Sequence, residues 1–260
     1  MSSPRNLLVF LCLMYLLIGI DSAHAQVLNV EQYAVDADTA DVWMGSLSFG
    51  FNLSKQRRQV INLRNDANLT YFSTNHQYLF LNRINLLDVA QEVSVNDGYF
   101  HLRGIFNRHR RFNPEGFIQY QYNFETGMQR RFLTGSTIRI NLISESSFSG
   151  SIGTGLMLEN ELWTDEEGEE EVERTLLKST SSVNIRESLG EHIELVFFGY
   201  YQARPDRFFE PRITMDGQVQ FRIMENMRLS IQWVSTYDAA PVLDSPQWVY
   251  SLTNNIIFSF

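Results

Sequence analysis

Cysteine is almost absent from this chain. Its single cysteine, Cys12, lies in an apolar run from Leu7 to Ile20. A short basic start precedes the run, and Ala23-His24-Ala25 after it fits a small-x-small cleavage site, so we expect residues 1–25 to be a cleaved signal peptide. A membrane-anchor helix is the alternative, but the run is short for a span. Without Cys12 the mature chain has no thiol, which excludes disulfides, zinc–thiolate and iron–sulfur sites, and a cysteine nucleophile.

Long apolar runs and basic charge are also scarce. After residue 25 no stretch approaches the roughly 20 apolar residues that a helical span requires, so insertion into a membrane would have to use strands. The chain holds 21 lysines and arginines against 30 acidic residues, a formal net charge of −9. Since nucleic-acid binding needs a basic surface, we expect no nucleic-acid partner.

The sequence does contain long stretches in which apolar and polar residues alternate. In the last stretch, residues 248–260, the even positions are large and apolar except at Asn254, and most odd positions are small and polar. A period of two is typical of a β-strand with one apolar and one polar face. Residues 118–125 repeat the pattern most clearly, as Ile, Tyr, Tyr and Phe alternate with Gln, Gln, Asn and Glu.

About twelve such runs follow one another from residue 41 to 260, most of them ten to fourteen residues long. Tilted membrane-spanning strands need about ten residues, and a single-chain barrel has an even number of strands. We therefore predict an all-β fold, a single antiparallel transmembrane β-barrel of about 12 strands over residues 41–260, with residues 26–40 as a periplasmic lead-in.

The predicted connections alternate in length. Those near 73–75, 112–116, 144–146, 187–191 and 224–227 are short, and Asn113-Pro114-Glu115-Gly116 is a strong turn signal. Those near 91–97, 164–175 and 238–247 are longer. Short turns on one side and longer loops on the other are typical of outer-membrane barrels, so the predicted location is the outer membrane of the cell, reached by export.

The terminal run ends on aromatic residues. We predict that it pairs with the first strand to close the barrel, and that Phe258 and Phe260 form a signal for assembly. The expected partners are the barrel-assembly machinery, periplasmic chaperones, and outer-membrane lipids including lipopolysaccharide.

The polar faces of the predicted strands carry charges of both signs. The predicted lumen-lining residues are Arg64, Asp66, Arg83, His101, Arg103, Arg139, Glu159, Lys178, Arg212 and Asp216. If they line a water-filled pore, the protein is a narrow passive channel for small polar solutes. If they pair across neighbouring strands and fill the interior, it is a structural or adhesion-like envelope protein with a closed lumen.

Catalytic and metal sites find little support in the sequence. His101 and His109 lie eight residues apart, too far for one metal site without partners, and no serine–histidine cluster of a lipase is present, so we expect no enzyme and no cofactor. An acidic loop carries Asp165, Glu166, Glu167, Glu169, Glu170 and Glu171. We expect it to be solvated, although carboxylates could also gather calcium or magnesium between lipopolysaccharide phosphates.

Aromatic residues recur near the ends of the predicted strands, among them Trp43, Trp163, Trp233 and Trp248. Such positions suit the aromatic girdles of a membrane barrel at the two interfaces. The core of a soluble β-sandwich is the alternative, but it would not explain twelve long strands with loop lengths that alternate.

Four motifs in residues 98–163 carry a family resemblance. They are Gly98-Tyr99-Phe100-His101-Leu102-Arg103-Gly104, residues 116–123 (GFIQYQYN), Arg130-Arg131-Phe132-Leu133-Thr134-Gly135, and Gly153-Thr154-Gly155-Leu156. In this order they resemble the family catalogued as domain of unknown function 481, described as salt-induced outer-membrane proteins, over roughly residues 40–260. The resemblance implies an outer-membrane β-barrel and offers no catalytic residues. The chain departs from the family at Ser136-Thr137, where more glycine is expected, and in its acidic loop.

Overall fold

The computed structural model describes residues 41–55, 59–89, 92–145, 147–165, 169–224, 227–243 and 246–258. The predicted signal peptide and lead-in, residues 1–40, lie outside these ranges, as do Phe260 and the loop carboxylates Glu166 and Glu167. Among the described residues, no helix is both long and apolar enough to cross a membrane.

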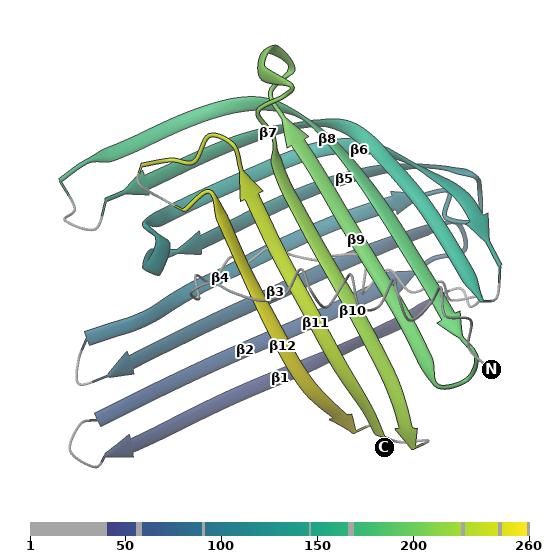
Figure 1. Ribbon diagram of the computed structural model, residues 1–260, viewed down its shortest axis with the longest axis horizontal. Helices are drawn as coiled ribbons and strands as arrows, with labels where there is room; N and C mark the ends of the chain where they lie inside the picture. Colours follow the sequence, from purple (N-terminus) through teal and green to yellow (C-terminus); the bar gives the residue numbers. More distant parts are fainter. Residues whose placement is uncertain are drawn as a thin grey trace, which may run out of the picture.

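The described chain is a single antiparallel sheet of twelve strands, in which each strand pairs with the next along the sequence (Figure 1). The strands are β1 (Val42–Lys55), β2 (Gln59–Phe72), β3 (His76–Val89), β4 (Glu92–Phe106), β5 (Phe112–Asn123), β6 (Met128–Ser144), β7 (Phe148–Thr164), β8 (Glu171–Leu189), β9 (Ile193–Ala203), β10 (Arg212–Met224), β11 (Met227–Asp238) and β12 (Trp248–Phe258). Two single-turn 3-10 helices, η2 (Phe124–Thr126) and η3 (Pro205–Arg207), lie in the loops before β6 and β10. The predicted all-β antiparallel fold is confirmed.

The two faces of the sheet differ as the period of two requires. On the convex face large apolar side chains are exposed along nearly every strand: Leu47 is 76% exposed on β1, Leu102 53% on β4, Leu156 53% on β7 and Ile256 61% on β12. The concave face carries most of the polar and charged side chains together with a small apolar cluster of Leu79, Leu81, Tyr99 and Ile105. Because of this cluster, β3 carries apolar residues on its concave face as well as on its convex face.

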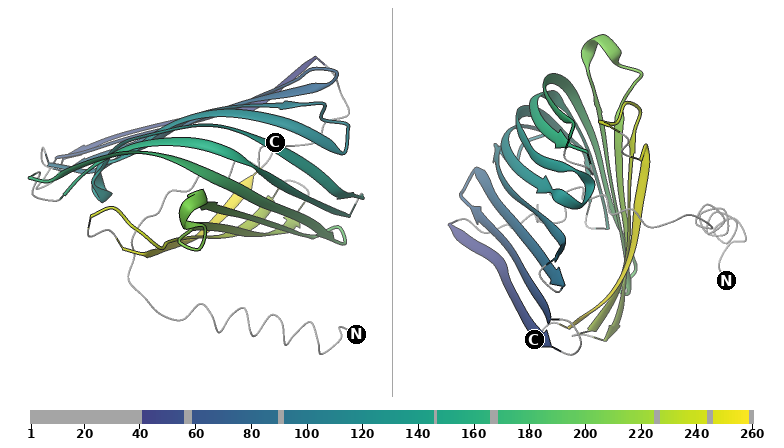
Figure 2. Two further views of the ribbon diagram at one scale, coloured as in Figure 1. Left: turned by 90° about the horizontal axis from the view of Figure 1, so that it is seen from above. Right: turned by 90° about the vertical axis from the view of Figure 1, so that its left-hand side faces the viewer.

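The sheet curls strongly, so that β1 to β6 face β9 to β12 across the interior (Figure 2, right). The curl does not close into a complete barrel. In the described part of the chain, β1 pairs with β2 and β12 pairs with β11, but no ladder joins β1 to β12. The predicted closure of the terminal strand against the first strand is therefore not present here. The contacts that cross the interior, given below, join β4 to β9 and β7 to β10, so they fix the curl in the middle of the sheet rather than at its edges.

One predicted turn was wrong. The chain reverses at residues 107–111, between β4 and β5, and Asn113-Pro114-Glu115-Gly116 belongs to β5. Pairing of β5 with β4 begins only at Glu115, so Pro114 has β6 alone as a neighbour and its missing N–H is tolerated. The Asn113 side chain donates to the carbonyl oxygens of Asn107 and Arg110, so it stabilises the turn from the adjoining strand.

The connection lengths agree only partly with the predicted alternation. The connections at 165–170, 204–211 and 239–247 are the long ones, and all three follow odd-numbered strands. The expected loop at 91–97 was wrong, because β4 begins at Glu92 and leaves only residues 90–91 between the strands. Before β6 the chain reverses in a tight turn that ends at Gly127, whose φ of 80° favours glycine.

Candidate functional site

The largest group of buried charges surrounds Glu159 on β7. Its carboxylate, 0% exposed, forms ion pairs with Arg131 on β6, Lys178 on β8 and Arg212 on β10. Arg212 lies 2.8 Å from Glu159 Oε1, and this contact spans the two strands that separate β7 from β10 in the sheet. Three cations therefore converge on one desolvated carboxylate, which holds the two strands together across the concave face.

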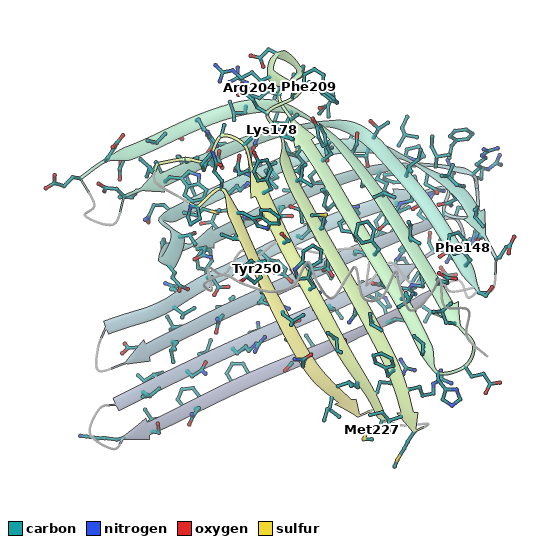
Figure 3. The ribbon with its side chains drawn as sticks, viewed as in Figure 1. Phe148, Lys178, Arg204, Phe209, Met227 and Tyr250 are labelled. Atoms are coloured by element: carbon teal, nitrogen blue, oxygen red, sulfur yellow. The ribbon has the colours of Figure 1, made fainter. Side chains whose placement is uncertain are left out.

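Further ion pairs extend this group toward the ends of the strands. Glu161, also fully buried, pairs with Arg174 and lies 3.9 Å from Arg131 and 3.8 Å from Arg212. Arg212 additionally donates from Nε to Asp238 Oδ2 at 2.7 Å. We call the set Arg131, Glu159, Glu161, Arg174, Lys178, Arg212 and Asp238 the Glu159 network. Figure 3 places Lys178 just below the loop that carries Arg204 and Phe209.

A second group lies on β4, β5 and β6. Arg103 Nη1 is 3.0 Å from Glu115 Oε2, and Arg139 pairs with the other oxygen of the same carboxylate. Arg103 Nη2 also donates to the hydroxyl of Tyr200 on β9 at 3.2 Å, across the interior of the curled sheet. We call Arg103, Glu115 and Arg139 the Glu115 network. A carboxylate that accepts from two arginines has both oxygens satisfied, which burial requires.

A cavity of about 60 Å³ lies between the two networks. Arg103 and Glu115 of one network and Arg131 and Arg212 of the other contribute to its wall. His101, Gln119, Gln202 and Thr214 add polar groups, and Phe117 and Leu133 add apolar ones. Since one water needs roughly 10–15 Å³ of such volume, the cavity has room for several water-sized groups.

His101 is oriented by two neighbours in the cavity wall. Its Nδ1 lies 2.9 Å from Gln119 Oε1, and its ring stacks on Phe117 with centroids 6.0 Å apart. The side chain is 2% exposed, and Nε2 has no hydrogen-bond partner among the described residues. Because Gln119 Oε1 can only accept a hydrogen bond, Nδ1 carries the proton and Nε2 is a buried hydrogen-bond acceptor.

The structure brings together six of the residues predicted to line a lumen. His101, Arg103, Arg139, Glu159, Lys178 and Arg212 lie in the two networks or in the cavity wall. Asp66 and Arg83 form a separate pair, 2.9 Å apart, on β2 and β3. Asp216 lies further along β10 and accepts from Gln232 at 2.9 Å, and Arg64 on β2 is exposed.

Five members of the two networks were missed in the sequence, namely Glu115, Arg131, Glu161, Arg174 and Asp238. Glu115 was assigned to a turn because the Asn-Pro-Glu-Gly signal outweighed the alternation. Arg131 and Glu161 share the face of Arg139 and Glu159 on their strands, so the period of two could have found them. The Tyr200 contact with Arg103 joins residues 97 positions apart, and no local pattern reveals such a contact.

The acidic loop is partly structured by its own residues. Asp165 Oδ1 accepts from the backbone N–H groups of Glu169 at 2.8 Å and Glu170 at 3.1 Å. Glu171 belongs to β8 rather than to the loop, which corrects its predicted place. In the ranges that the structure describes, no three acidic, histidine or cysteine side chains are grouped so that they could hold a metal ion.

The loop between β9 and β10 rises above the rest of the sheet in Figure 1. Phe209 at its tip is 91% exposed. Two ion pairs, Arg204 with Asp206 and Arg207 with Glu210, join residues of the same loop. The hydrogen bond from Arg204 holds the pKa of Asp206 below its usual value.

Comparison with known proteins gives weak matches in structure and none in sequence. No family model matches the chain, and no curated protein matches it. Among solved structures, the NanC porin is similar at a TM-score of 0.49 and 6% identity, covering 83% of this chain and all of that one. The β-domain of the Bordetella autotransporter BrkA is similar at a TM-score of 0.34 and 10% identity, covering 84% of this chain and 98% of that one. No function is transferred from similarities of this size.

Proposed function

We propose that this chain is an integral outer-membrane β-barrel whose interior is filled by side chains, an envelope protein with a closed lumen. The apolar convex face carries this proposal. Apolar side chains such as Leu47, Leu102 and Ile256 are more than half exposed on strands spread along the whole sheet. In water a surface of this kind would aggregate, whereas lipid covers it without cost.

The remaining parts of the proposal follow from the sequence. A cleaved signal peptide at residues 1–25 and a lead-in at 26–40 would deliver residues 41–260 to the periplasm for assembly. The resemblance to the salt-induced outer-membrane family supports the same destination. Lipopolysaccharide and other outer-membrane lipids would then be the partners of the convex face.

The buried charges favour a closed lumen over a pore. Residues that line a water-filled channel stay accessible to solvent, but the side chains of Arg103, Lys178 and Arg212 are at most 10% exposed, and Glu159 is fully buried. The bonds from Arg103 to Tyr200 and from Arg212 to Glu159 also cross the interior. Side chains that pair across the interior in this way support a closed lumen over a water-filled pore.

A conductance measurement distinguishes a barrel with a closed lumen from a narrow passive channel. We expect the purified mature chain to insert into planar bilayers without stable unitary current, because ion pairs block the interior at two levels. Insertion is checked independently by protection of the strands from added protease in vesicles. Reproducible current steps from protein that has inserted would overturn the closed lumen and support the channel.

Closure of the barrel is open to a cross-linking test. In lipid, unpaired N–H and C=O groups along β1 and β12 would each cost several kcal/mol, so we expect these strands to pair in the membrane. The mature chain has no cysteine, so a Phe49→Cys change on β1 can be combined with Cys at Tyr250, Leu252 or Asn254 on β12. A seam in which Phe49 lies opposite one of these residues brings that pair within the Cα separation of about 4.4–6.8 Å that a disulfide requires.

The expected result is an oxidised, cross-linked band in one combination after assembly, seen by electrophoresis. Phe49→Cys with Leu177→Cys, on the convex face of β8, is the matched control and should remain uncross-linked. Absence of the cross-link from all three combinations in folded protein would contradict a seam in which Phe49 lies opposite residues 250–254.

A further inference from the structure

The two networks carry more positive than negative charge. Together they hold six cations and four carboxylates, all linked by ion pairs. Asp216 on the same face lies outside the cavity wall, and counting it still leaves cations in excess. The whole chain has a formal net charge of −9, so this buried excess is opposite in sign to the protein that surrounds it.

The excess is concentrated at the cavity. Three arginines, Arg103, Arg131 and Arg212, contribute to its wall, and Glu115 is the only carboxylate there among the described residues. A guanidinium binds oxyanions through several N–H groups in a planar fork, so a wall with three arginines is suited to an anion. An anion in this cavity would therefore offset the excess and meet donors suited to it.

His101 is a second, independent sign of a ligand. Its Nδ1 is held by Gln119 and its ring by Phe117, so Nε2 is fixed in the wall of the cavity. This atom is buried and has no hydrogen-bond partner in the described part of the chain. Gln119 in turn donates from Nε2 to Gln121 Oε1, so its own orientation is fixed by the next polar residue along β5. A ligand in the cavity that donates a hydrogen bond would give Nε2 the partner that the described residues do not supply.

We propose that the cavity between β4–β6 and β8–β10 binds a small oxyanion that carries a proton, such as hydrogen phosphate, held by Arg103, Arg131 and Arg212 and by a hydrogen bond from its O–H group to His101 Nε2. The volume of about 60 Å³ suits an anion of a few heavy atoms and is small for a sugar or a nucleotide. The site goes beyond the proposed function, because a closed barrel needs no ligand in its interior.

Titration calorimetry on the mature chain, folded in detergent micelles, tests the site with sodium phosphate at neutral pH and constant ionic strength. Sodium chloride serves as the reference for non-specific ion effects. We expect saturable binding at one site. Arg131→Met and His101→Phe should each weaken it by about tenfold or more, since each removes one hydrogen bond to a charged group. His101→Phe keeps an aromatic ring to stack on Phe117.

The control is Arg64→Met, the same change at an exposed position of β2 outside the cavity wall, and it should bind as the wild type does. Each variant is shown to be folded before heating if its heated sample migrates more slowly in electrophoresis than its unheated sample. If Arg131→Met fails to fold, His101→Phe decides. The anion site would be overturned if the folded wild type showed no saturable binding, or if both cavity variants bound the anion as tightly as the wild type. Neither result would affect the membrane proposal. Failure to fractionate with the outer membrane would overturn the membrane proposal alone.

Discussion

Replacing Glu159 by glutamine should destabilise the folded protein by about 3–5 kcal/mol, because it leaves Arg131, Lys178 and Arg212 buried around a neutral group. Glutamine has nearly the same shape as glutamate, so the loss comes from charge rather than from packing. The measurement is the free energy of unfolding in urea, with the protein folded into lipid vesicles.

The matched control is Glu173→Gln, the same change in an ion pair that solvent reaches. Glu173 lies 2.6 Å from Arg130, and the two side chains are about half exposed. An exposed pair contributes at most about 1 kcal/mol, so the control should differ little from the wild type. Equal losses in the two variants would mean that the Glu159 network is screened by water, as in an open channel.

A second variant keeps the test useful if Glu159→Gln does not fold. Combining it with Lys178→Met removes one of the three cations together with the carboxylate. The double variant should be more stable than Glu159→Gln alone, since fewer unpaired charges remain buried. A double variant less stable than the single one would show that Lys178 contributes by packing and not by its charge.

The alternation in the sequence predicted most of the fold and part of the site. It placed Arg103 and Glu159 on the polar faces of their strands, because the period of two is a local property of extended backbone. It could not show that Arg212 reaches Glu159 or that Arg103 reaches Tyr200, since those contacts depend on how strongly the sheet curls. The cavity results from the same curl and was therefore also beyond the sequence.

The error in β5 has a physical cause. Turn propensity was given more weight than pairing at Asn113-Pro114-Glu115-Gly116, where proline sits at the end of a strand with one neighbour. The misplaced turn hid Glu115, which joins Arg103 to Arg139, so the Glu115 network could not be assembled from the sequence. Arg103 and Arg139 are connected through Glu115, so assigning Glu115 to a loop concealed the connection between them.

Leu156 offers the sharpest test of whether lipid or water covers the convex face. It lies in the middle of β7 and is 53% exposed. Leu156→Arg should lower the free energy of unfolding by about 2–4 kcal/mol if the strand spans a bilayer, because arginine is then placed near the midplane. If water covered this face, the same change at an exposed position would alter stability by no more than about 0.5 kcal/mol.

Leu189→Arg is the matched control, at the last residue of β8, where the side chain is 46% exposed. Near the membrane interface the cost of arginine falls to about 0–1 kcal/mol, so this variant should unfold close to the wild type. Urea titration of all three proteins in vesicles gives the comparison. A large decrease in the free energy of unfolding for Leu156→Arg with a small decrease for Leu189→Arg would place the middle of β7 near the centre of the bilayer. Equally small decreases for the two variants would contradict a sheet that spans the membrane. These two variants therefore test whether the protein lies in a membrane without depending on whether the cavity binds an anion.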